Sequence, residues 1–323
     1  MAITLKQAYD LFLNDRYTFS ADKTIIYYKE NLTRFLNYVT ECDQTITFLD
    51  DLPDDILIKY VKYLRKRHRF EDHPVTPQSN ELIKNTTIHT YCRAVKVFLR
   101  FCQEEDYLHV NIKIPKLPKS DAEQKIPLYI DEVKQIDATF NLKTKLGLRN
   151  YCIVHLMLDA GLRSSEVANL RFRDLLFDKN VLHLEVSKGY KSRVVLMCPK
   201  LKQNLYKYAV MYRSYSDDTA EQMANDFFFI GIRDDNPITV NTVKQFFSRL
   251  KAKTGIDRLH PHLLRHTFAT SYIMGGGNLE MLRILLGHYD YSVTQNYLHL
   301  AAQYKLMQAD IYRLDPIFFK TAY

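Results

Sequence analysis

The stretch from Lys145 to Met197, KLGLRNYCIVHLMLDAGLRSSEVANLRFRDLLFDKNVLHLEVSKGYKSRVVLM, decides the fold class of this chain. Its first part, residues 145–159, is strongly apolar and is followed by Gly161, which predicts a buried helix ending before the glycine. Three short runs rich in Leu and Val then predict β-strands. They lie at residues 175–177, 181–186 and 193–197. The last two flank a hairpin tip that contains Gly189, so the stretch predicts a helix-rich unit with a small antiparallel sheet.

Both flanks of this stretch predict further helices. Apolar residues recur at helical spacing at residues 4–14, 21–41, 53–69 and 86–106, with Thr4 as the expected N-cap of the first segment. The side chains expected to face the core are Leu5, Ala8, Leu11, Phe12, Ile25, Ile26, Leu32, Leu36, Val39, Ile56, Tyr60, Tyr63, Leu64, Ile88, Cys92, Val95, Leu99 and Cys102. Asp131 is expected to cap a helix through about residue 140. After residue 197 we expect helices to about residue 312, apart from an acidic loop at 214–226.

An irregular segment separates two expected domains. Pro115, Pro118 and Pro127 exclude a regular helix across residues 109–128. We therefore expect a helical domain over residues 1–110, a linker over 111–127 and a second domain over 128–323. The fold class is mainly α with a small antiparallel β-sheet, a helical domain followed by an α+β domain.

Composition narrows the function. The 323 residues carry 45 Lys and Arg against 37 Asp and Glu, a formal net charge of +8, which suggests a polyanionic partner. Apolar residues at 46% and charged residues at 25% are typical of a folded chain and argue against disorder. The nine glycines form neither a P-loop nor a dinucleotide-binding motif.

The expected compartment is the cytoplasm. Five cysteines without a C-x-x-C pair favour neither a disulfide framework nor a zinc site. The N-terminus lacks the layout of a signal peptide, and no apolar run approaches the ~18 residues of a membrane span. We therefore expect a soluble, intracellular protein.

Two basic stripes mark the first domain. One stripe, on segment 53–69, consists of Lys59, Lys62, Lys66 and Arg69. The other, on segment 86–106, consists of Arg93, Lys96 and Arg100. A single such stripe is ordinarily a solvated surface. Two stripes in one small helical unit, with few acidic residues between them, favour a nucleic-acid contact.

Four short segments of the second domain concentrate side chains that bind phosphate. They are Gly161-Leu162-Arg163-Ser164-Ser165-Glu166, the hairpin tip with Lys188, Pro261-His262-Leu263-Leu264-Arg265-His266, and Leu286-Gly287-His288 followed nine residues later by Tyr297. Each has an ordinary explanation when taken alone: Arg163 could pair with Glu166 on the surface, and the histidines could be core groups. Their order and spacing together favour one shared site.

With these segments in this order, the chain resembles the tyrosine recombinase family, the integrases and Xer-type recombinases. The resemblance covers most of the chain and implies a helical core-binding domain followed by an α+β catalytic domain. It implies that a set of basic residues activates a DNA phosphodiester, namely Arg163, Lys188, His262, Arg265 and His288. It further implies that Tyr297 is the nucleophile and that Glu166 supports the site. Lys191, on the same hairpin, is an alternative to Lys188.

The residue types suit the reaction that the resemblance implies. Arg163 and Arg265 offer planar, paired donors to the charge that develops on the non-bridging oxygens of a five-coordinate phosphorus. A free tyrosine with a pKa near 10 is only about one part in a thousand ionised at pH 7, so the site must favour the phenolate of Tyr297 or remove its proton during attack. The surrounding cations and His262, as the base, can do both. Lys188 would protonate the departing 5′ oxygen. His288 would bind the phosphate or position Tyr297. The product would be a 3′-phosphotyrosyl link with a free 5′-hydroxyl, and no metal or cofactor is expected.

Two other functions remain open at this point. His260, His262 and His266 form an H-x-H-x3-H pattern that could hold a metal in a hydrolase, although this leaves Arg163 and Tyr297 without a role. A catalytically idle DNA-binding regulator of the same fold is the second alternative. Covalent capture of DNA separates a catalyst from a regulator, and activity in a chelator argues against a metal.

The expected partners are double-stranded DNA and further copies of the chain. The basic stripes and Lys191 are the expected DNA contacts, with no membrane association. The apolar tail residues Leu314, Ile317, Phe318 and Phe319 would either fold onto their own domain or dock on a neighbouring subunit of a DNA-bound tetramer. We expect a cytoplasmic, nucleoid-associated integrase or transposase-type enzyme of a mobile element or chromosome. Because the first predicted helix begins near residue 4, we expect the two-domain layout of Xer-type enzymes without an arm-binding domain.

Overall fold

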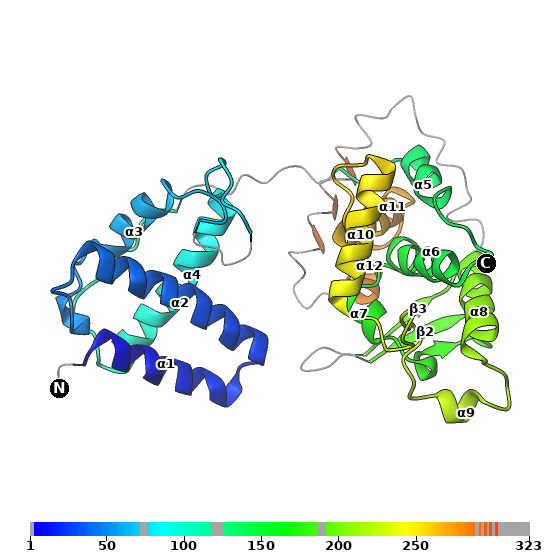
Figure 1. Ribbon diagram of the computed structural model, residues 1–323, viewed down its shortest axis with the longest axis horizontal. Helices are drawn as coiled ribbons and strands as arrows, with labels where there is room; N and C mark the ends of the chain where they lie inside the picture. The colour runs from blue at the N-terminus through cyan, green and yellow to red at the C-terminus, as the bar shows by residue number, and fades with distance from the viewer. Residues whose placement is uncertain are drawn as a thin grey trace. The chain divides into compact units, whose positions relative to one another are not determined.

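The structure is a computed structural model that describes residues 3–71, 76–117, 126–185, 192–287, 291, 294–295, 297–298 and 301–302. The chain separates into two compact units, residues 1–124 and 125–323 (Figure 1). Each unit has its own apolar core. No helix within the described ranges is long and apolar enough to cross a membrane.

The first unit is helical. It contains α1 (Leu5–Phe19), α2 (Asp22–Cys42), the short 3-10 helix η1 (Leu49–Asp51), α3 (Ile56–Leu64) and α4 (Asn85–Glu104). Helices α1, α2 and α4 pack against one another around Phe12, Phe35 and Phe98. Thr4 is confirmed as the N-cap of α1, because its Oγ1 accepts a hydrogen bond from the Gln7 backbone N–H and Gln7 Oε1 accepts one from the Thr4 N–H.

The prediction that a residue faces the core is wrong at two positions of this unit. Leu11 is 39% exposed and Ile26 is 52% exposed. Ile26 directly follows the buried Ile25, and consecutive helical residues point about 100° apart, so one of the two faces solvent.

The third helix is shorter than its apolar pattern predicts. It ends at Leu64, so Lys66 and Arg69 lie beyond it in turns and not on the stripe with Lys59 and Lys62. The chain leaves the helix because the backbone then pairs with residues 79–83. Arg69 N–H donates to the Glu81 carbonyl at 2.8 Å, and Ile83 N–H donates to the Arg67 carbonyl at 3.1 Å.

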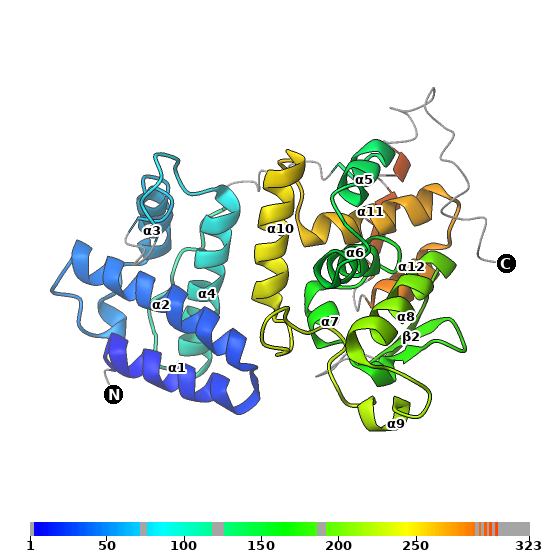
Figure 2. The ribbon, with the colours of Figure 1, turned by 45° about the vertical axis from the view of Figure 1, so that its right-hand side comes forward.

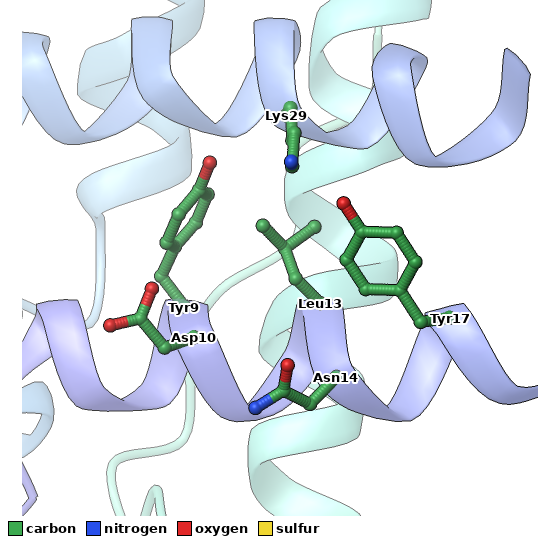
Figure 3. A pocket seen from close by; sticks show the side chains of 6 residues that line it. All are labelled: Tyr9, Asp10, Leu13, Asn14, Tyr17 and Lys29. Atoms are coloured by element: carbon green, nitrogen blue, oxygen red, sulfur yellow. The ribbon is translucent and has the colours of Figure 1, made fainter. Parts of the chain in front are cut away.

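An open pocket of about 510 Å³ lies between α1 and α2 (Figure 3). Tyr9, Leu13 and Tyr17 line it at four-residue spacing on α1, and the Lys29 side chain enters from α2 with its ammonium 5.3 Å from the centre of the Tyr17 ring. A hydrogen bond with Tyr17 raises the pKa of Lys29. The pocket contains none of the motif residues, and Lys29 is exposed at its edge.

The second unit is built around one helix that is buried nearly all round. Helix α6 (Lys145–Leu158) follows the short α5 (Ile130–Asp137) and packs against α8 (Pro199–Arg213) and α11 (Pro261–Met274), as Figures 1 and 2 show. The remaining helices of this unit are α7 (Ser164–Asn169), the 3-10 helix η2 (Phe172–Asp174), α9 (Ala220–Met223), α10 (Val240–Thr254) and α12 (Leu279–Leu286). The prediction of a buried helix ending before Gly161 is confirmed.

Two boundaries in this unit differ from expectation. Helix α5 ends at Asp137 and begins after Tyr129, so Asp131 is not its cap; Glu132 instead accepts a hydrogen bond from the Tyr129 N–H at 2.8 Å. The acidic segment 214–226, expected as a loop, contains the short helix α9.

The predicted sheet is confirmed, with strands shorter than expected. Strands β1 (Leu175–Leu176), β2 (Val181–Leu184) and β3 (Arg193–Leu196) form an antiparallel sheet in the order β1-β2-β3. Leu182 pairs with Val195, and Leu184 pairs with Arg193. Because strand residues alternate between faces, the buried Leu182, Leu184 and Val195 place Arg193 on the inner face as well.

A buried ionic network joins three helices of the second unit. The ring nitrogens of His155 on α6 lie 2.8 Å from Asp159 Oδ2 and 2.8 Å from Asp137 Oδ1 of α5. Cys198, at the N-terminus of α8, donates its thiol to Asp159 at 3.8 Å. Burial opposes the charge on the imidazole, but Asp159 and Asp137 outweigh burial and raise the pKa of His155 to about 9.

This network predicts a pH-dependent stability. The pKa of His155 is higher in the folded chain than its value near 6.5 in the unfolded chain, so protonated His155 stabilises the fold. This stabilisation is complete below about pH 6.5 and is lost as the pH rises through about 9. We expect the free energy of unfolding to fall by roughly 3 kcal/mol between pH 6.5 and 9.5 in urea titrations. His155→Gln should remove this pH dependence. His109→Gln, which alters an exposed His–Asp pair, should keep it, and an unchanged pH profile in His155→Gln would refute the assignment.

Candidate active site

The Gly-Leu-Arg segment turns the chain from α6 into α7. Gly161 adopts φ +66°, and a Cβ there would lie 2.6 Å from the ring of Phe268. Only glycine therefore fits this turn. The turn brings Arg163 to the N-cap of α7 and directs the Gly161 carbonyl toward α11, where Arg265 binds it.

Glu166 lies one turn into α7 and accepts hydrogen bonds from Arg163. The Arg163 backbone N–H donates to Oε2 at 2.7 Å, and Arg163 Nη1 donates to Oε1 at 3.1 Å. Burial opposes ionisation of Glu166, but Arg193 and then Arg163 outweigh it and keep the pKa of the carboxyl below its usual range. The pair is therefore a partly buried ionic contact and not the surface pair that the sequence alone allows.

Arg265 lies on α11 and is buried, with only 5% of the residue exposed. Its guanidinium donates to the Gly161 carbonyl and to the Leu286 carbonyl at the end of α12. Burial and the nearby charge of Arg163 lower the pKa of Arg265 to about 9, so the group remains a cation at neutral pH.

Arg193 is a site residue that the sequence analysis missed. Its side chain is 2% exposed and reaches from the inner face of β3 to Glu166, where Nη1 and Nη2 donate to the two carboxylate oxygens at 2.7 and 2.8 Å. The signal was present in the sequence, because Arg193 shares a strand face with Val195. A cation on the buried face of a strand requires a partner.

Three guanidiniums meet at the C-terminal end of α12. Arg193 Nε donates to the Leu285 carbonyl at 2.7 Å, Arg265 donates to the Leu286 carbonyl, and Arg163 Nη2 donates to the Gly287 carbonyl at 3.1 Å. The last carbonyls of a helix have no partner within the helix, and its C-terminus favours cations. The helix end therefore fixes all three arginines.

Tyr297 lies beside this group. It packs against the small apolar cluster of α11 and α12, and its ring centre is 5.3 Å from that of the buried His266. Burial raises the pKa of Tyr297, while the charges of Arg265 and Arg163 act in the opposite direction. The phenol is therefore protonated at neutral pH, and its nearest charge environment is cationic.

The histidines of the third segment lie in different environments. His262 is exposed in the first turn of α11, one turn before the buried Arg265. His260 is the N-cap of α11, and its Nδ1 accepts a hydrogen bond from the Leu263 N–H at 3.2 Å. Among the residues that the structure describes, no three His, Cys, Asp or Glu side chains are grouped to hold a metal.

Three predicted site residues lie outside the described residues: Lys188, Lys191 and His288. The same holds for the tail residues Leu314, Ile317, Phe318 and Phe319. The structure does describe the residues on both sides of the hairpin tip and the residue before His288. Arg193 follows the hairpin tip, and Gly287, with φ +61°, ends α12 directly before His288.

The predicted DNA contacts of the first unit are on its surface. Arg93 and Arg100 are exposed on α4, with Lys96 partly exposed between them. Arg100 pairs with Glu104 at 2.8 Å. On α3, Lys59 pairs with Asp55 at 2.8 Å, and Lys62 is exposed.

Comparisons with known proteins identify the family of this chain. The model of the phage integrase family matches residues 127–304, more than half of the chain. A tyrosine recombinase of Thermosipho africanus is 30% identical over 292 residues, covering 88% of this chain and 91% of that protein. The tyrosine recombinase XerC of Staphylococcus epidermidis is 28% identical over 262 residues, covering 77% of this chain and 85% of that protein.

Solved structures share the fold. The integrase of transposon Tn1549, in complex with transposon right end DNA, has a TM-score of 0.70 at 18% identity and covers 94% of this chain and 99% of that one. The XerH recombinase bound to its palindromic difH substrate has a TM-score of 0.68 at 17% identity, covering 89% of this chain and 79% of that one. The fold, the ordered motifs and the family match lead to one conclusion. The chain belongs to the phage integrase family, the tyrosine site-specific recombinases.

Proposed function

We propose that this chain cleaves and rejoins duplex DNA through a 3′-phosphotyrosyl intermediate on Tyr297. The observation that carries the proposal is the fixed position of two guanidiniums, Arg163 and Arg265, beside a partly buried phenol. Paired guanidiniums are the natural ligands of a phosphodiester. The tyrosine beside them would attack the phosphorus.

The proposed step exchanges one phosphoester for another. Tyr297 Oη forms a bond to phosphorus while the bond from phosphorus to the 5′ oxygen breaks. His262 takes the phenol proton, and Lys188 gives a proton to the departing 5′ oxygen. Because the protein–DNA link conserves the phosphodiester, a 5′-hydroxyl from another strand reverses the step and joins the strands without ATP.

Fixed cations take the role of transition-state stabilisers in this proposal. Arg163 and Arg265 would neutralise the charge that develops on the non-bridging oxygens, and each such donor is typically worth a factor of ~10²–10³ in rate. His288 would add a hydrogen bond to the phosphate or to Tyr297, and Glu166 would orient Arg163. Lys191 is the alternative proton donor to Lys188.

We also propose that the active assembly is a tetramer on DNA, with the tail of one subunit docked on the next. The relatives of known structure support a DNA partner, since the XerH recombinase is bound to difH and a lambda integrase dimer is bound to a COC' core site. The basic faces of α3 and α4 would hold the first domain on the duplex. Sedimentation of the chain with two-site DNA tests the assembly, and a species no larger than a dimer would rule the tetramer out.

Covalent capture tests the proposed reaction. Wild-type protein is mixed with duplex DNA carrying the target site and a nick close to the cleavage point, so that the released fragment diffuses away and the link accumulates. We expect a DNA–protein band resistant to detergent, formed equally in a chelator, and a DNA-linked peptide containing Tyr297. Tight DNA binding without any covalent band would favour the idle regulator.

The basic stripe of α4 predicts a salt-dependent contact. Replacing Arg93, Lys96 and Arg100 by Glu should weaken DNA binding more than tenfold at ~0.1 M salt. Each phosphate contact contributes about 0.9 to the slope of log K against log salt, so the slope should fall by about 2–3. Binding is measured by fluorescence anisotropy over a range of salt.

The matched control for the α4 stripe is a triple substitution of the same charge on α1 and α2. Lys6, Lys23 and Lys29 are exposed, and replacing them by Glu changes the net charge equally. Equal losses in the two variants would mean that net charge and not the α4 stripe determines binding.

A further inference from the structure

Two arginines share Glu166 unequally. Arg193 donates both Nη atoms to it at 2.7 and 2.8 Å, whereas the Arg163 guanidinium donates only Nη1, at 3.1 Å. The Arg163 backbone N–H provides the fourth donor, at 2.7 Å. A carboxylate has about four lone-pair positions, so the acceptor capacity of Glu166 is filled.

The position of Arg193 is built into the fold. Its side chain leaves the inner face of β3, and its Nε is held by the Leu285 carbonyl at 2.7 Å. A Cβ on Gly287 would lie 3.1 Å from Arg193 Nη1, so a larger residue at position 287 would press on this guanidinium. The absence of a side chain at position 287 leaves room for Arg193.

The charges of the three groups follow from this geometry. The Glu166 carboxylate lies between the guanidiniums of Arg163 and Arg193, so these three side chains together carry one net positive charge. The bidentate, shorter contact belongs to Arg193. Arg163 keeps Nη2 on the Gly287 carbonyl, a neutral acceptor at 3.1 Å, and the Arg163 side chain is 30% exposed.

We propose that Arg193 is a positioning residue that occupies Glu166 and thereby leaves the guanidinium of Arg163 available to a DNA phosphate. This inference rests on the proposed function of Arg163. Without Arg193, two acceptor positions on a partly buried carboxylate would open. The other guanidinium in contact with that carboxylate is Arg163, and paired contacts of arginine with carboxylate are stronger than single ones. Arg163 would then be drawn onto Glu166 and away from the phosphate.

The test is suppression by a second substitution. In Arg193→Met, we expect the rate of covalent complex formation at saturating DNA to fall about 100-fold, the scale of losing one stabilising cation. Glu166→Gln alone should cost less than about tenfold, since a neutral amide still accepts from Arg163. The double variant Arg193→Met/Glu166→Gln should be at least fivefold faster than Arg193→Met, because no carboxylate is left to capture Arg163.

Controls separate positioning from folding and from the proposed function. Arg173→Met breaks an exposed pair with Glu185 in the same unit and should cleave at the wild-type rate. Thermal unfolding is measured for every variant. If Arg193→Met does not fold, Arg193→Lys replaces it, because lysine keeps the positive charge but has a single nitrogen and cannot occupy both oxygens of Glu166 in the same way. If the double variant is as slow as Arg193→Met while the wild type cleaves DNA, the positioning role of Arg193 is overturned and the proposed function stands. A wild-type protein without a covalent complex would overturn both.

Discussion

Tyr297→Phe is expected to abolish the covalent DNA complex while leaving DNA affinity within about twofold of wild type. The substitution removes one oxygen and keeps the ring that packs on the α11–α12 cluster and beside His266. Without the phenol oxygen no bond to phosphorus forms, so the loss should exceed ~10⁴-fold, the scale on which removal of a nucleophile is felt. Covalent capture on nicked DNA measures the first quantity, and anisotropy measures the second.

Tyr291→Phe is the matched control. Tyr291 precedes Tyr297 by six residues, is helical and is 45% exposed. It should form the covalent complex at the wild-type rate. A covalent band that persisted in Tyr297→Phe would show that another residue is the nucleophile, and peptide mapping of that band would identify it.

The positions of Gly161, Arg163 and Arg265 in the secondary structure follow from local turns and helix starts that the sequence displays. Gly161 ends one helix and brings Arg163 to the start of the next, and the spacing in the third segment places Arg265 on α11. Apolar periodicity likewise predicted α6 and the helices of the first unit. Such features depend on residues within one or two turns of each other, which a sequence displays directly.

Long-range contacts account for what the sequence did not predict. Arg193, which binds Glu166, lies 27 residues away from it along the chain. The Gly161 and Leu286 carbonyls lie 104 and 21 residues away from Arg265, which binds them. The early end of α3 depends on backbone pairing with residues 79–83, which no helical pattern contains. Strand alternation would have placed Arg193 on the buried face, but its partner becomes visible only in the folded chain.

Arg265 should be the most sensitive cation of the site, because it stabilises the fold and, in the proposed reaction, would also bind the phosphate. Its guanidinium satisfies the carbonyls of Gly161 and Leu286, and leaving them unpaired costs about 1–3 kcal/mol each. Arg265→Ala is therefore expected to lower the free energy of unfolding by about 2–6 kcal/mol and to slow cleavage more than ~10³-fold. Urea titration and single-turnover capture measure the two effects.

Arg265→Lys separates these two roles of Arg265. A lysine keeps the positive charge, but its single ammonium does not reproduce the planar fork that binds both carbonyls and that would also bind the phosphate in the proposed reaction. We expect cleavage about 100-fold slower than wild type at saturating DNA, with a smaller loss of stability than in Arg265→Ala. Arg149→Lys is the control, because Arg149 is also 5% exposed and donates to a backbone carbonyl, that of Ile230, at 2.7 Å. Arg149→Lys should lose stability and retain the cleavage rate, so an equal loss of rate in the two lysine variants would assign the effect of Arg265 to folding and not to the phosphate.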